Sequence, residues 1–143
     1  RDADEVLAGL DELIRSYPLA GRTPNRVLVS HSLPGLREMP TFDATVLSRI
    51  PDDQDLHDGG SAHALVWGRY QSAAALETLS ELLDADFFIC GHQPQETGYE
   101  ILHDRMVILA SDHNHGTFLT LDLSKPVTID TLIRNIRPFA AIE

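Results

Sequence analysis

Two histidines each follow an apolar run that is too short to form a helix. Residues 27–30 lead directly into His31, and residues 87–90 lead through Gly91 into His92. Short apolar runs bounded by turn residues are typical of buried strands. If the two strands are parallel neighbours, both imidazoles emerge at the edge where α/β sheets bind ligands. Because neutral imidazole is the commonest metal ligand, the pattern predicts that His31 and His92 share a metal site.

A helical pattern between the two runs supplies the connection that parallel strands need. It covers residues 72–84 and places on one face Leu76, Leu79, Leu82 and Leu83. We expect this face to pack on the sheet. At the end of the second strand, Gly91 is expected to let the chain turn without a Cβ in the way.

An amphipathic helix is predicted at the N-terminus, where Pro18 ends it. Its apolar stripe consists of Val6, Leu7, Leu10, Leu13, Ile14 and Tyr17. We expect the stripe to pack into the core. The alternative is a face that binds a partner.

The chain after His92 has a β pattern. Residues 99–102 and 106–110 flank Asp104 and Arg105, which predicts a hairpin, and residues 116–121 predict a further strand. Residues 127–138 predict a last edge strand, with a helix over 132–136 as the alternative. Together these elements predict an α/β fold with a mixed β-sheet and flanking helices, in a single domain over residues 1–143.

The segment from residue 33 to residue 60 is irregular, with a short helix expected near residues 45–50. Its acidic run, residues 52–60, suggests calcium binding but does not have the EF-hand spacing. A solvated acidic loop is therefore the preferred interpretation.

The composition sets outer bounds on function. The net charge of −11 argues against nucleic-acid and anionic-membrane partners, which require a clustered basic face. No apolar run approaches the length of a membrane span. The single cysteine, Cys90, excludes an internal disulfide framework and fits a reducing compartment, so we expect a cytoplasmic protein. We expect Cys90 itself to be a small core residue in a strand.

Four segments resemble, in chain order, motifs of calcineurin-like metallophosphoesterases, particularly the serine/threonine protein phosphatase branch. Residues 29–34, Val-Ser-His-Ser-Leu-Pro, look like the family's His-Gly-Gly segment, and residues 65–69, Leu-Val-Trp-Gly-Arg, look like its Leu-Leu-Trp-Ser segment. Gly-His-Gln at residues 91–93, followed by Gly-Tyr-Glu at 98–100, resembles the family's Ala-His-Gln and Gly-Tyr-Glu. Residues 109–115 stand where the family has Ser-Ala-Pro-Asn-Tyr.

This resemblance implies the fold of half a metallophosphoesterase-type α/β sandwich. The family's Asp-x-His, Gly-Asp-x-x-Asp-Arg-Gly and Gly-Asn-His motifs do not occur in the chain, which therefore looks like the C-terminal part of the domain. The missing half is expected to hold most ligands of the two-metal centre and the catalytic acid.

The resemblance also assigns roles to residues that are present. His31 and His92 are expected to ligate the same one of two divalent ions, manganese or iron foremost, with zinc or magnesium as alternatives. Arg69 is expected to bind phosphate oxygens, since a guanidinium matches phosphate geometry. A surface arginine that covers Trp67 is the competing interpretation.

A polar cluster follows the apolar run at residues 107–109. It consists of His113, Asn114 and His115, which are expected to line the same crevice, with a plain polar turn as the alternative. His115 stands at the family's tyrosine position, so the role of that phenol does not carry over.

The resulting functional expectation is a metal-dependent phosphoesterase. It resembles serine/threonine protein phosphatases and is expected to hydrolyse phosphate monoesters, on a protein or a small molecule, with a metal-activated hydroxide. The isolated chain is expected to be inactive or weakly active, and another segment or chain to complete the site. The alternatives are a non-catalytic interaction module derived from phosphatases and a dinucleoside polyphosphate hydrolase.

Overall fold

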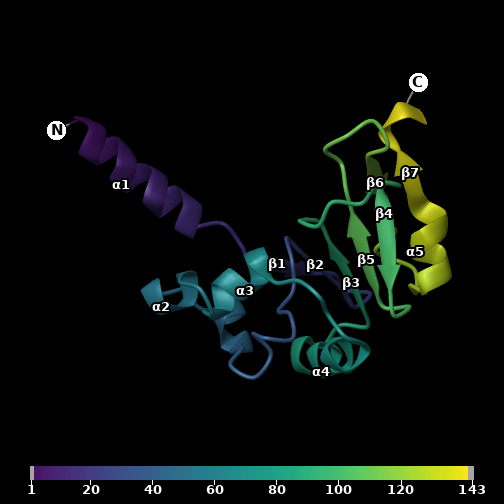
Figure 1. Ribbon diagram of the computed structural model, residues 1–143, viewed down its shortest axis with the longest axis horizontal. Helices are drawn as coiled ribbons and strands as arrows, with labels where there is room; N and C mark the ends of the chain where they lie inside the picture. The colour runs from purple at the N-terminus through teal and green to yellow at the C-terminus, as the bar shows by residue number, and fades with distance from the viewer. Residues whose placement is uncertain (1, 142–143) are drawn as a thin grey trace.

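A mixed five-stranded sheet lies at the centre of the computed structural model, which describes residues 2–141. Its strand order is β1-β2-β3-β5-β4 (Figure 1). The strands are β1 (Ala20–Arg22), β2 (Val27–Ser30), β3 (Phe87–Cys90), β4 (Tyr99–Leu102) and β5 (Met106–Leu109). Strands β2, β3 and β5 are parallel, whereas β1 and β4 run antiparallel to their neighbours. The predicted mixed α/β architecture, including the β4–β5 hairpin, is therefore confirmed.

One face of the sheet is covered by α4 (Ala73–Leu83), the predicted connecting helix. Ser72 caps its first turn by accepting a hydrogen bond from the Ala75 amide, and Asp84 ends it in a left-handed conformation. The helix and the strands share a buried cluster that includes Leu76, Leu79, Leu83, Phe88, Met106 and Ile108. Leu82 does not belong to the buried face and is 50% exposed.

The other face packs on α5 (Ile129–Asn135), whose Leu132 is fully buried against Val27, Ile89 and Val107. Strand-like sequence therefore forms a helix here, and the prediction of an edge strand over residues 127–138 was mostly wrong. The reason is local, because Thr128 and Thr131 form a capping box that starts the helix. Only β7 (Ile136–Pro138) is extended, and it pairs with β6 (Thr117–Leu119) in a separate two-stranded sheet. A short 3₁₀ helix, η2 (Phe139–Ala141), follows.

Three short helices occupy the segment before α4. They are η1 (Ala44–Ser48), a 3₁₀ helix close to the predicted position, α2 (Asp53–Leu56) and α3 (Ser61–Trp67). Most of the acidic run is exposed to solvent, as expected, but it is not all loop: residues 53–56 form α2, and Asp55 is only 7% exposed and forms a two-pronged ion pair with Arg49. Capping by Asp52 and pairing by Arg49 together explain why this acidic segment is helical.

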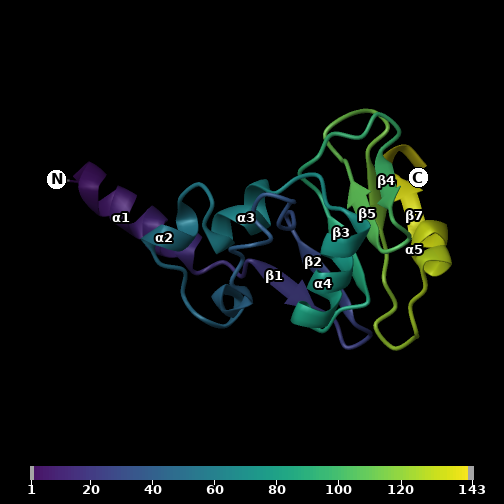
Figure 2. The ribbon, with the colours of Figure 1, turned by 60° about the horizontal axis from the view of Figure 1, so that its bottom comes forward.

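The N-terminal helix α1 (Asp2–Arg15) extends away from the sheet (Figures 1 and 2). It has no buried residue, and Leu7, Ile14 and Tyr17 are each more than 60% exposed. The expectation that its stripe packs into the core is therefore wrong for the part of the chain that the structure describes. An amphipathic pattern indicates that a face suits apolar contact, but it does not specify which surface supplies that contact. Among residues 2–141, no helix has the length and apolar content required to cross a membrane.

Candidate functional site

The carboxyl ends of the three parallel strands meet around one small cavity. His31 follows β2, Gly91 and His92 follow β3, and Ser111 and Asp112 follow β5 by two and three residues. The cavity has a volume of about 330 Å³ and is lined by His31, Gly91, His92, Gln93, Pro94, Leu109, Ala110, Ser111 and Asp112. It lies at the ligand-binding edge expected of such a sheet.

The two predicted imidazoles are in direct contact at this edge. Nε2 of His31 lies 3.1 Å from Nδ1 of His92, and the ring centroids are 4.9 Å apart. The backbone holds the pair together as well, because the Gly91 amide donates to the His31 carbonyl at 3.1 Å. The parallel pairing of β2 and β3 thus does bring two residues 61 positions apart into one cavity.

The turn that presents His92 is not made in the way we expected. Gly91 does not require the absence of a side chain, since an added Cβ would meet only the Leu109 carbonyl oxygen at 3.7 Å. His92 itself adopts the left-handed conformation, with φ of 65°. A non-glycine residue pays a conformational cost for this backbone, and such positions cluster at functional sites.

Arg69 is the third side chain of the site, and it contacts His92. Its Nε donates to Nε2 of His92 at 3.3 Å. A guanidinium has no acceptor, so Nε2 of a neutral His92 carries no proton, and its Nδ1–H donates to His31. The pKa of His92 is lowered by burial first, and then by the nearby His31 and Arg69. All three causes favour the neutral imidazole that can bind a metal ion.

The spacing of the two ring nitrogens suits ligation of a single ion. Two imidazole nitrogens that each lie about 2.0–2.1 Å from one ion, at tetrahedral or octahedral angles, are separated by about 2.8–3.4 Å. The observed 3.1 Å falls within that interval, and the same contact is a hydrogen bond for as long as Nδ1 of His92 carries its proton. A group of three or more histidine, cysteine or carboxylate side chains placed to hold a metal does not occur among residues 2–141. The histidine pair could therefore supply part of a coordination sphere.

The three polar residues expected to line the histidine cavity, His113, Asn114 and His115, do not line it. His113 has both ring nitrogens engaged, since Nε2 donates to the Gln95 carbonyl at 2.7 Å and Nδ1 accepts from the His115 amide at 3.1 Å. Asn114 and His115 line a separate cavity of about 340 Å³. In place of His113, Asn114 and His115, the histidine cavity has Ser111 and Asp112.

Asp112 is the lining residue that reasoning from sequence missed. Residues 106–110 were predicted only as one arm of a hairpin. Their parallel pairing with β3, which brings Asp112 to the same edge as His31 and His92, is seen only in the structure.

Gln93 and Cys90 show what surrounds the pair. The Gln93 side-chain nitrogen is buried and has no hydrogen-bond partner among the described residues. Cys90 is a buried core residue of β3, as predicted, and burial raises the pKa of its thiol to about 12. A thiol of this kind is a poor nucleophile at neutral pH.

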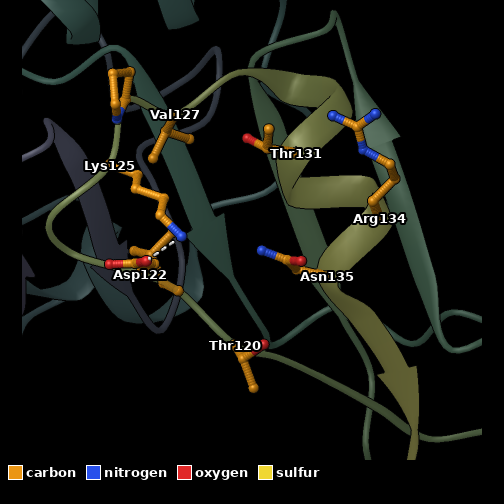
Figure 3. A pocket seen from close by; sticks show the side chains of 9 residues that line it. Thr120, Asp122, Lys125, Val127, Thr131, Arg134 and Asn135 are labelled. Atoms are coloured by element: carbon orange, nitrogen blue, oxygen red, sulfur yellow. Dashed lines mark ion pairs between the residues drawn. The ribbon is translucent and has the colours of Figure 1, made fainter.

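A larger cavity lies elsewhere, between α5 and the loop before it (Figure 3). Its volume is about 600 Å³, and Lys125 at its rim pairs with Asp122 at 2.9 Å. Among the described residues, no histidine or cysteine lines it. The histidine cavity is thus the better candidate for chemistry, although it is smaller.

Comparison with known proteins does not identify the chain. It matches no protein-family model and no curated protein.

Proposed function

We propose that this chain is the C-terminal part of a metallophosphoesterase-type domain. The complete domain would be a metal-dependent enzyme that hydrolyses phosphate monoesters. The observation that carries the proposal is the 3.1 Å approach of His31 Nε2 to His92 Nδ1 at the carboxyl edge of parallel strands. The resemblance of four segments to the serine/threonine protein phosphatase branch supports it. A cytoplasmic location belongs to the same proposal and fits a single buried thiol.

His31 and His92 would hold one divalent ion through the two facing nitrogens. When bound, divalent ions at such a centre lower the pKa of water and neutralise phosphate charge. Ligation through Nδ1 of His92 would leave the remaining ring proton on Nε2. Nε2 would then no longer accept from Arg69, and the guanidinium would be available to bind phosphate oxygens.

The remaining ligands must come from another segment or chain, because two imidazoles hold an ion loosely. A second ion and a catalytic acid belong to that missing part, with manganese or iron foremost and zinc or magnesium as alternatives. The unpartnered Gln93 amide nitrogen fits such a completion. A buried donor without an acceptor costs about 1–3 kcal/mol, which an oxygen from the completing segment would offset.

A non-catalytic interaction module is the second candidate. The exposed apolar stripe of α1 favours it, because a long uncovered apolar face is typical of a surface that meets another polypeptide. The module would keep the fold without binding metal. Metal binding by the histidine pair therefore separates the two candidates.

The test is a titration of the chain with zinc, followed by NMR of the histidine rings. We expect saturable shifts of His31 and His92 that are lost in His31→Ala. His103→Asn serves as the matched control, since His103 is an exposed histidine in the β4–β5 turn. Equal binding by His31→Ala, or shifts spread evenly over all seven histidines, would overturn the proposal.

Turnover of p-nitrophenyl phosphate provides the second test. With added manganese, the isolated chain should remain near background, because the catalytic acid and most metal ligands are missing. Robust turnover that survives His92→Ala would show that the catalytic residues lie elsewhere.

A further inference from the structure

A second cavity opens directly beside the histidine pair. It has a volume of about 560 Å³ and is lined by Leu36, Arg37, Glu38, Trp67, Arg69 and Tyr70. Two of these residues, Trp67 and Tyr70, expose large aromatic rings, 58% and 78% exposed respectively. We call Trp67 and Tyr70 the aromatic shelf.

The aromatic shelf is carried by the end of α3, at Trp67, and by the loop after it, at Tyr70, and this segment packs against the loop after β2. A Cβ on Gly68 would lie 1.9 Å from the Leu33 carbonyl oxygen, so the two backbones touch there. The buried side chain of Ser32 donates to the Gly68 carbonyl, and Gln71 donates to the Leu33 carbonyl at 2.7 Å. Both rings therefore project from a backbone that is tied to the loop after β2 by two side-chain hydrogen bonds.

The backbone at Tyr70 is costly for an exposed ring. Its φ is 62°, in the left-handed region that aromatic residues rarely adopt. Contacts of the ring within the chain offset little of this strain, because most of the surface of Tyr70 faces solvent. Backbone strain of this kind also occurs at the α4 cap and in the β4–β5 turn of this chain, but at Tyr70 it presents a large ring to a cavity.

The aromatic shelf is continuous with the proposed phosphate site. The Trp67 ring meets the His92 ring edge-on at 5.3 Å, and Arg69 contacts His92 from the same loop. The cavity is also locally basic, with Arg37 and Arg69 against one carboxylate. That carboxylate, Glu38, accepts the Gly35 amide at 2.9 Å and so has a structural role.

We propose that the aromatic shelf binds a planar aromatic ring attached to the phosphate ester on which the histidine site acts. The preferred substrate class is thus a nucleotide or an aryl phosphate, ahead of an alkyl phosphate such as phosphoserine. Stacking of a base on an exposed aromatic side chain strengthens binding, and an arginine beside it adds charge attraction. This inference rests on the proposed function for the position of the phosphate.

Trp67 provides a direct readout, because it is the single tryptophan of the chain. Its indole N–H signal is followed by NMR during titration with AMP, phenyl phosphate, ribose 5-phosphate and glycerol phosphate. We expect AMP and phenyl phosphate to shift the signal saturably, at concentrations about 5-fold or more below those of the two alkyl phosphates. Tighter binding of AMP assigns the ring as a nucleobase, and tighter binding of phenyl phosphate assigns it as an aryl group.

Variants test whether the shelf itself makes the contact. Tyr70→Ala should weaken AMP binding about 5-fold or more. Tyr17→Ala, which removes another exposed ring (63% exposed) on the chain after α1, should leave it unchanged. Equal binding of AMP and ribose 5-phosphate, or an unchanged affinity in Tyr70→Ala, would overturn the inference.

Two further titrations distinguish failure of this inference from failure of the proposed function. Zinc binding is followed by the NMR signals of the His31 and His92 rings. If these signals do not shift, the metal site alone is overturned. Adenosine is read from Trp67 without metal or phosphate. A shift with adenosine and none with ribose supports the shelf even if zinc does not bind, and the absence of any adenosine shift counts against the shelf.

Discussion

Nε of Arg69 donates to Nε2 of His92, and this contact determines which nitrogen of the imidazole carries the proton. Because Nε2 of His92 accepts this hydrogen bond, the ring proton stays on Nδ1. Metal ligation through Nδ1 requires that nitrogen to be unprotonated. In the metal-free chain, Arg69 therefore competes with the ion for the protonation state of His92. Its positive charge also repels a cation.

Removal of this contact is predicted to strengthen metal binding. Arg69→Met should bind zinc about 2- to 10-fold more tightly, because one hydrogen bond to a neutral group, worth about 0.5–1.5 kcal/mol, no longer has to break. Calorimetric titration measures the change. Arg37→Met is the matched control, since Arg37 lines the neighbouring cavity but does not bond to His92. Weaker zinc binding by Arg69→Met would show that Arg69 supports the ligand geometry instead.

The left-handed backbone at His92 leads to a prediction about the glycine before it. Gly91→Ala should be neutral or stabilise the fold by about 0.4–1 kcal/mol, because the Cβ meets only an ordinary contact and the unfolded chain loses freedom. Denaturant unfolding gives the free-energy difference. The contrasting variant is Gly98→Ala, where φ is 88° and a Cβ would lie 2.1 Å from the His115 carbonyl oxygen. A large loss of stability in Gly91→Ala would contradict the backbone described for this turn.

The buried carboxylate of α2 predicts a defined pH dependence. Hydrogen bonding from Arg49 is the largest cause that lowers the pKa of Asp55 in the folded chain. Its contribution to stability is therefore fully present above the unfolded pKa of about 3.9, and it is lost as the pH falls through the lower folded value. Asp55→Asn should be less stable than the parent chain at neutral pH, and the difference should narrow below about pH 4. Thermal unfolding over a pH series measures this, with Asp104→Asn at an exposed position in the β4–β5 turn as the control. A gap that stays constant down to acid pH would exclude the ion pair as its cause.

Parallel pairing made the central part of the site predictable. Two apolar runs, a helix between them and the rule that parallel strands end at one edge were enough to bring His31 and His92 together. The contact of Arg69 with His92 could not be derived in this way, because it depends on how two irregular loops pack through Gly68 and Leu33. The helix α5 was also not the preferred prediction, because its sequence alternates as a strand does. The capping box of Thr128 and Thr131 starts a helix there instead.

The exposed stripe of α1 predicts that two leucines in two helices differ sharply in their effect on stability. Leu79 of α4 is fully buried, so Leu79→Ala should cost about 2–5 kcal/mol of unfolding free energy. Leu10 of α1 is 48% exposed, so Leu10→Ala should change that free energy by less than about 0.5 kcal/mol. Both variants replace leucine with the best helix former, so helix propensity does not explain the difference. A loss of several kcal/mol in Leu10→Ala, measured by denaturant unfolding of the isolated chain, would mean that α1 packs on the sheet domain. The stripe would then belong to this chain's own core, and the case for a second polypeptide on that face would be lost.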